Sequence, residues 1–290
     1  MNTRRNHRLA HCAMIVAAIV TIASSAVQAA KPASKTSKKT PVRVLFIGNS
    51  YTYGHKLPQL VAGMAAADKS VRPMEVKMVA SGGKDLVWHA NNKATLSAIA
   101  AGWDYVILQD QSLTPALMPH RSLAGARVLD AAIKKAGGKT MFFMTWQRRP
   151  TPDLLKRFPD MHKRNSATYI SMGRKLKAAV APVGYAWKMA YDEDPKRPLY
   201  ARDNSHPAHM GAYLSACVFY SMIYNKPPTG LPARITLSKS GRNRVVLGVP
   251  PAEAKKLQPI AWRAVQQAGK ELAAKPATRP AKKKPSRRAK

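Results

Sequence analysis

The stretch VRVLFIGNSYT, residues 42–52, decides the fold of this chain. Residues 42–47 are nearly continuous in branched and aromatic side chains, which is typical of a strand buried on both faces of a parallel sheet. Gly48 and Asn49 follow as a small-residue turn, and Ser50 then stands just ahead of a helical pattern. A serine in this place exposes its hydroxyl at the carboxyl edge of the sheet. A serine that only caps the next helix is the alternative at this point.

Outward from this stretch, short β-rich runs alternate with longer helical patterns, which predicts one α/β domain over residues 42–274: a parallel sheet of about five strands between two helical layers. The predicted strands are residues 42–47, 74–79, 105–108, 139–145 and a short one near 183–186. The predicted helices are residues 57–68, 86–101, 122–136, 162–181 and 208–224, with a hairpin of 234–237 and 244–247 before a last helix at 251–273. In such a doubly wound sheet, chemistry belongs at the carboxyl ends of the strands.

The first 29 residues have the pattern of a signal peptide: a basic start, an apolar run over residues 13–26 and an Ala-x-Ala-like site ending at Ala29 or Ala30. A membrane anchor is the alternative, but Ser24, Ser25 and Gln28 cut the run short of the roughly 20 residues that a spanning helix needs. We therefore expect export to the periplasm or the medium, with no membrane span after cleavage.

The formal net charge is +35, and part of it is concentrated in a linker at residues 30–41 and a Pro/Ala-rich tail at 275–290. Both segments have the composition of disordered chain. They either attach the protein to a polyanion, such as nucleic acid, anionic glycan or lipid head groups, or merely keep it soluble. The remaining chain is also basic, which gives weight to an anionic substrate or surface.

Metal and disulfide chemistry are not indicated. Cys217 would be the one cysteine of the mature chain, and its apolar helical setting favours a buried, inert thiol. The histidines outside the motifs have no ligand partners at metal spacing, so we predict no metal and no cofactor. These are His89, His120, His162 and His209.

A second motif, DNSHP at residues 203–207, precedes the helical pattern that begins near Ala208. An aspartate and a histidine separated by two residues can hydrogen-bond, so that the carboxylate orients the imidazole while its other nitrogen faces a serine. The alternative is an N-capping side chain beside a surface histidine. Together the two motifs predict a triad of Ser50, Asp203 and His206.

These blocks resemble the SGNH/GDSL hydrolase superfamily, and most of all a little-characterised bacterial branch with a Gly-Asn-Ser first block and a Leu-Gln-acidic-Gln-Ser third block. The resemblance covers residues 42–224 and implies a three-layer, flavodoxin-like sheet. It also implies that Ser50 is the nucleophile with Asp203 and His206 as its partners. The backbone amide of Ser50 and a glycine after the second strand, Gly82 or Gly83, would contribute to the oxyanion hole.

The third block departs from the superfamily pattern. LQDQS at residues 108–112 stands where the superfamily has Gly-x-Asn-Asp, whose asparagine donates to the oxyanion. A glutamine amide has the same donor chemistry, with Gln109 as the first choice and Gln111 as the second. Trp88 and Trp146 could line a sugar-binding cleft, although packing is the commoner role of such aromatic residues.

The sequence thus predicts an exported serine esterase that deacylates a glycan or a small ester through an acyl-enzyme. The competing hypothesis is a non-catalytic binding protein on the same scaffold, attached to polyanions through its basic tails.

Overall fold

The computed structural model describes residues 40–239 and 242–274. The predicted signal peptide, nearly all of the basic linker and the whole basic tail lie outside these residues. Among the described helices, none combines the length and the apolar character needed to cross a bilayer.

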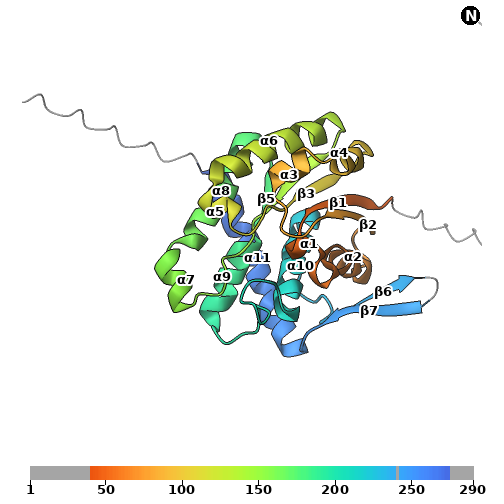
Figure 1. Cartoon of the computed structure of the whole chain (residues 1–290). Helices are drawn as coiled ribbons and strands as arrows, with labels where there is room; N and C mark the ends of the chain where they lie inside the picture. The colour runs from red at the N-terminus through yellow and green to blue at the C-terminus, as the bar shows by residue number, and fades with distance from the viewer. Residues whose placement is uncertain (1–39, 240–241, 275–290) are drawn as a thin grey trace, which may run out of the picture. The chain divides into compact units, whose positions relative to one another are not determined.

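The centre of the fold is a five-stranded parallel sheet in the order β2-β1-β3-β4-β5. This is the flavodoxin-like order, and it confirms the predicted fold class. Figure 1 shows β2, β1 and β3 side by side. β1 pairs with β2 on one side and with β3 on the other, so the order of strands reverses beside β1. The strands are β1 (Val42–Gly48), β2 (Met74–Ala80), β3 (Tyr105–Leu108), β4 (Lys139–Phe143) and β5 (Ala179–Ala181).

Helices cover both faces of this sheet, with α6 and α8 on one side and α2 and α10 on the other (Figure 1). One layer holds α3 (Leu86–Ala90), α4 (Lys93–Ala100), α6 (Pro119–Lys135) and α8 (Met161–Leu176). The other holds α2 (Leu57–Ala67), α9 (Val183–Glu193), α10 (His209–Tyr224) and α11 (Pro251–Ala273). Short elements follow the strands or form a hairpin beside α2: α1 (Ser50–Tyr53), η1 (Gly54–Lys56), α5 (Thr114–Leu117), α7 (Pro152–Arg157), β6 (Arg234–Lys239) and β7 (Arg242–Gly248).

The core lies between sheet and helices and is rich in aromatic side chains. Phe219 of α10 meets Phe46 of β1 edge-on at 5.5 Å and Phe143 of β4 at 4.8 Å. Each of these three rings is completely buried, which stabilises the fold by about 1.5–3 kcal/mol per side chain. Cys217 is also completely buried in α10, and this burial raises the pKa of its thiol.

The prediction of the fifth strand was wrong. β5 is Ala179–Ala181, and residues 183–186 instead open α9, which the sequence analysis missed. A short apolar run does not distinguish a strand from a buried helical turn, and Val183, Ala186 and Ala190 are all buried on one side of α9. The helix predicted for residues 162–181 ends at Leu176, because Lys177 adopts a left-handed conformation that terminates it.

The helix predicted for residues 86–101 is two helices, α3 and α4. Asn92 separates them, because its side chain accepts a hydrogen bond from the Thr95 amide and caps α4. The remaining predicted helices and the hairpin agree with the structure to within a few residues.

Candidate active site

Ser50 is the first residue of α1, immediately beyond the end of β1. Asn49, and not Ser50, caps this helix, because the Asn49 side chain accepts from the Tyr51 amide at 3.2 Å. The Ser50 hydroxyl is therefore free of the capping role that was the alternative. Two residues ahead of Ser50, at position 48, only glycine fits. A Cβ at Gly48 would come within 2.3 Å of the Thr52 hydroxyl and 2.4 Å of Gln109 Oε1.

Ser50, Asp203 and His206 meet in space. His206 Nε2 lies 2.8 Å from Ser50 Oγ, and His206 Nδ1 is hydrogen-bonded to Asp203 Oδ2. Asp203 Oδ1 also accepts from the amides of Ser205 and His206 at 3.0 and 2.9 Å. Partial burial opposes ionisation of Asp203, but these hydrogen bonds outweigh it and lower the pKa of the carboxyl to about 2.

An ionised Asp203 fixes the proton of His206 on Nδ1, so Nε2 accepts from the Ser50 hydroxyl. This is the arrangement that a general base needs to activate a serine. The side chains of His206 and Asp203 are 43% and 48% exposed, which leaves the serine–histidine pair within reach of a substrate.

An aromatic stack holds the His206 loop against the helix of Ser50. Tyr51 stacks on Trp146 at 4.5 Å, and Trp146 stacks in turn on Trp187 at 3.8 Å. The Tyr51 hydroxyl lies 2.6 Å from Ser205 Oγ, and Trp146 Nε1 donates to the Ser205 carbonyl at 2.9 Å. Sequence analysis missed Tyr51 and Ser205, although both stand next to predicted triad residues.

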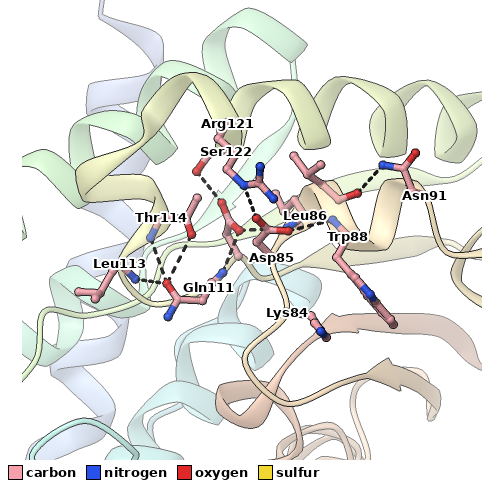
Figure 2. A network of polar contacts seen from close by, with 12 residues as sticks. Lys84, Asp85, Leu86, Trp88, Asn91, Gln111, Leu113, Thr114, Arg121 and Ser122 are labelled. Atoms are coloured by element: carbon pink, nitrogen blue, oxygen red, sulfur yellow. Dashed lines mark hydrogen bonds and ion pairs between the residues drawn. The ribbon is translucent and has the colours of Figure 1, made fainter.

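Trp146 is therefore a packing residue, and its proposed place in a sugar-binding cleft is corrected: its side chain is completely enclosed in the stack. Trp88, in contrast, is only partly buried on α3, and Lys84 Nζ lies 5.6 Å from its ring centre. Figure 2 shows these two side chains next to each other.

Gln109 is completely buried, and both ends of its amide have protein partners. Its Oε1 accepts from the Asn49 amide at 2.9 Å and from the Thr52 hydroxyl at 2.8 Å. Its Nε2 donates to Asn49 Oδ1 at 2.9 Å and to the Asp110 carbonyl. Neither N–H is left for an oxyanion, so the first choice for that role is corrected: Gln109 braces the turn that carries Ser50.

Gln111 differs from Gln109 because only the oxygen end of its amide has close hydrogen-bond partners. Its Oε1 accepts from the amides of Leu113 and Thr114 at 2.7 and 3.2 Å, as Figure 2 shows. Its Nε2 has only a long contact of 3.4 Å, to the Ser112 hydroxyl. Ser112 also lies next to Tyr51, since it is one of the two serines whose hydrogen bonds influence the Tyr51 hydroxyl. Burial raises the pKa of this hydroxyl, and the hydrogen bonds with Ser205 and Ser112 partly offset that rise.

The loop after β2 brings Gly82 and Gly83 to the same edge of the sheet. The Ser81 amide donates to the Gly48 carbonyl at 3.0 Å, which ties this loop to the end of β1. Gly82 faces α1, since a Cβ on it would lie 3.4 Å from the Tyr53 hydroxyl, whereas Gly83 has open space and a φ of +68°. Of the two glycines, Gly82 is thus the one that faces α1.

Asp110, a residue that the sequence analysis did not single out, clamps the loops after β2 and β3 together. Its Oδ1 accepts from the amides of Leu86 and Gln111 at 3.0 and 2.8 Å, and its Oδ2 accepts from the Ser122 hydroxyl at 2.5 Å. Burial raises the pKa of this carboxyl to about 6. An acidic residue two positions beyond the end of a buried strand was the signal that could have identified it.

A surface ion pair continues this network in Figure 2. Arg121 Nε donates to Asp85 Oδ2 at 2.5 Å, and Asp85 Oδ1 caps α3 by accepting from the Trp88 amide at 2.8 Å. The loop after β2, through Asp85, and the loop after β3, through Asp110, are therefore both anchored to α6.

His89 is hydrogen-bonded to the last residue of β1. Its Nε2 lies 2.9 Å from the Gly48 carbonyl and its Nδ1 3.0 Å from the Thr95 hydroxyl, and burial lowers the pKa of the ring, which favours its neutral form. Within residues 40–239 and 242–274, no group of three or more His, Cys, Asp and Glu side chains is arranged to hold a metal ion.

Comparison with known proteins finds likeness at the level of structure. No family model matches the chain, and no curated protein matches its sequence. A solved structure described as "a putative SGNH hydrolase from Slackia heliotrinireducens" is 27% identical over 63% of this chain and all of its own, with a TM-score of 0.56. A DUF4886 family protein from Bacteroides uniformis is 18% identical over 78% of this chain and 95% of its own, with a TM-score of 0.61. An acetyl xylan esterase is 13% identical over 63% of this chain and all of its own, with a TM-score of 0.51.

Proposed function

We propose that this chain, which by its fold belongs to the SGNH/GDSL hydrolase superfamily, is an exported serine esterase that works through an acyl-enzyme. The observation that carries the proposal is the 2.8 Å approach of His206 Nε2 to Ser50 Oγ, with Asp203 hydrogen-bonded to the other ring nitrogen. Residues 156 positions apart in the chain have no local reason to meet in this way.

In the proposed reaction, Ser50 Oγ attacks the ester carbonyl carbon while His206 Nε2 takes the hydroxyl proton. Asp203 stabilises the imidazolium that forms. The same proton passes from His206 to the departing alcohol as the C–O bond breaks. Water then attacks the acyl-enzyme, with His206 again accepting the proton, and the acid and free Ser50 are released.

The oxyanion of each tetrahedral intermediate needs aimed N–H donors. The Ser50 amide is one, because N–H groups in the first turn of a helix have no intrahelical partner. We assign the others to the amide of Gly82 and to Nε2 of Gln111, whose carbonyl end is already held by two backbone amides.

For the substrate we propose an acylated glycan or a small ester outside the cytoplasm. The pattern of a signal peptide in residues 1–29 supports export, and the exposed triad supports access for a bulky substrate. An acetyl xylan esterase shares the fold, and the partly exposed Trp88 offers a ring face on which a sugar can stack.

The test is the substitution Ser50→Ala, assayed on 4-nitrophenyl acetate and by labelling with a fluorophosphonate. The matched control is Ser97→Ala, which removes an exposed serine from α4. We expect Ser50→Ala to abolish both turnover and labelling with an unchanged melting temperature, and Ser97→Ala to change neither. Folded protein that hydrolyses no ester, or that hydrolyses it equally well without Ser50, would contradict the proposal and favour the binding-protein hypothesis.

A further inference from the structure

Arg148 lies in the segment after β4, which is anchored to both halves of the triad. Two residues before it, Trp146 stacks on Tyr51, the neighbour of Ser50. Immediately after it, the amide of Arg149 donates at 2.8 Å to the carbonyl of Asn204, inside the loop that carries Asp203 and His206. Arg148 is thus held beside the reacting groups by backbone and packing contacts on either side.

Its charge reaches the site as well. Burial raises the pKa of the Tyr51 hydroxyl, and the positive charge of Arg148 is one of the influences that oppose this rise. The guanidinium is therefore within electrostatic range of the side chain that hydrogen-bonds to Ser205.

Arg148 has no hydrogen-bond or ion-pair partner in the part of the chain that the structure describes. The residue is half-buried, and its Nε is fully enclosed without an acceptor. Arg197, in contrast, is paired: it binds Glu253 and the Ala190 carbonyl. Arg174 also has an enclosed Nε without an acceptor, but its Nη2 donates to the Glu271 carbonyl, whereas Arg148 makes no hydrogen bond in the described residues. A charge that is partly withdrawn from water without a partner costs free energy, which an entering anion would recover.

The surrounding charges favour such an anion. Asp203 is committed to His206 and two amides, so it is not available to Arg148. Arg202 adds positive charge and is exposed next to Asp203. The Arg149 guanidinium donates through Nη2 to the Pro195 carbonyl at 3.3 Å and is not assigned to the anion. A site with this field attracts negatively charged substrates.

We propose that Arg148 binds a carboxylate of the substrate, so that the enzyme prefers esters that carry a negative charge near the scissile bond, such as acetylated uronic-acid glycans. The proposal rests on the esterase function proposed above. Arginine suits this role because its fork of N–H groups pairs with the two oxygens of a carboxylate.

The experiment compares two acetate esters that differ in one charge, 4-acetoxybenzoate and 4-acetoxybenzamide, at 150 mM salt. The quantity measured is the ratio of kcat/KM for the charged ester to kcat/KM for the neutral ester. The variants are Arg148→Gln, Arg148→Lys and the neighbouring Arg149→Gln as matched control. We expect the wild-type ratio to exceed one and Arg148→Gln to lower it at least tenfold, which corresponds to about 1.4 kcal/mol. Arg148→Lys should restore part of the ratio, and Arg149→Gln should leave it within twofold.

The inference is overturned if Arg148→Gln lowers kcat/KM for both esters equally, or if Arg149→Gln lowers the ratio as much as Arg148→Gln does. Calorimetric binding of 4-acetoxybenzoate to the Ser50→Ala protein, with and without Arg148→Gln, separates this inference from the esterase proposal. Binding that depends on Arg148 supports the inference even where no Ser50-dependent turnover is found. Binding that does not depend on Arg148 refutes it whatever the turnover.

Discussion

The two glutamines of the third block provide the sharpest test of the site, because they differ in what their amides contact. Gln111→Ala removes the Nε2 donor that we assign to the oxyanion. The loss of one such donor lowers kcat by roughly 10²–10³, or about 2.7–4 kcal/mol of transition-state stabilisation. The cost in fold stability is smaller, since the amides of Leu113 and Thr114 lose a capping acceptor worth about 1 kcal/mol.

Gln109→Ala should mainly lower the stability of the fold, whereas Gln111→Ala should mainly lower kcat. The side chain is completely buried and makes four hydrogen bonds, among them those from the Asn49 amide and the Thr52 hydroxyl. Each buried group left without its partner costs about 1–3 kcal/mol, in addition to the cavity. We therefore expect a loss of several kcal/mol of unfolding free energy, and a lowering of the melting temperature by about 2–4 °C for each kcal/mol.

The assay measures kcat on 4-nitrophenyl acetate and thermal unfolding on the same preparations. Gln111→Glu serves as a further control, because it keeps the acceptor for Leu113 and Thr114 while replacing the NH₂ donor by a negative charge. If Gln111→Ala retains kcat to within threefold, Gln111 is not an oxyanion donor. If Gln109→Ala melts like the wild type but loses kcat a hundredfold, the two roles have been exchanged in our assignment.

Two further predictions concern the groups around the triad. In the folded protein, burial gives Asp110 a pKa of about 6, above the value near 3.9 of an unfolded aspartate. The stability linked to this carboxyl is therefore fully present below about pH 4 and is lost as the pH rises to about 6. Asp110→Asn should remove this decline, worth about 3 kcal/mol, from denaturant titrations across that window, and an unaltered decline would contradict the assignment. Tyr51→Phe should lower kcat more than it raises KM, because Ser205 loses its partner beside His206 while the stack on Trp146 remains. The control is Tyr220→Phe, which removes a hydroxyl bound to Asp68 at the C-terminal end of α2 and should leave kcat unchanged.

The central strands β1 and β3 were predictable because they are buried on both faces. Residues 44–47 and 106–108 are continuous runs of Val, Ile, Leu and Phe, and all of them are enclosed in the core. β5 was not predictable in the same way: it has three residues, two of them alanines, which have little preference for a strand. The pairing of Met141 to Phe143 with it, rather than any local signal, determines its place.

The positions of Ser50 and of the Asp203–His206 pair were also predictable, since both follow local rules of strand ends and turns, and the three side chains do meet. The supports of the triad were not, because they depend on side chains that meet only in the folded chain. Trp146 illustrates the difference: its position after a strand predicts an exposed aromatic at the active edge, yet Tyr51 and Trp187 enclose it from two sides. The pattern of residues along the sequence does not show that these three rings stack in the folded chain.

The difference between Gln109 and Gln111 follows from where the third strand leaves the sheet. The Gln109 amide still donates to the Ile47 carbonyl at 2.9 Å, so this residue continues the ladder beside β1 after β3 formally ends at Leu108. Its side chain consequently lies against Gly48, beneath the turn of Ser50, and is completely buried. Gln111 comes two residues later, after Asp110 has turned the chain by accepting the amides of Leu86 and Gln111. A donor for the oxyanion must stand above the sheet edge and not within it, and for that reason we assign this role to the glutamine beyond the turn.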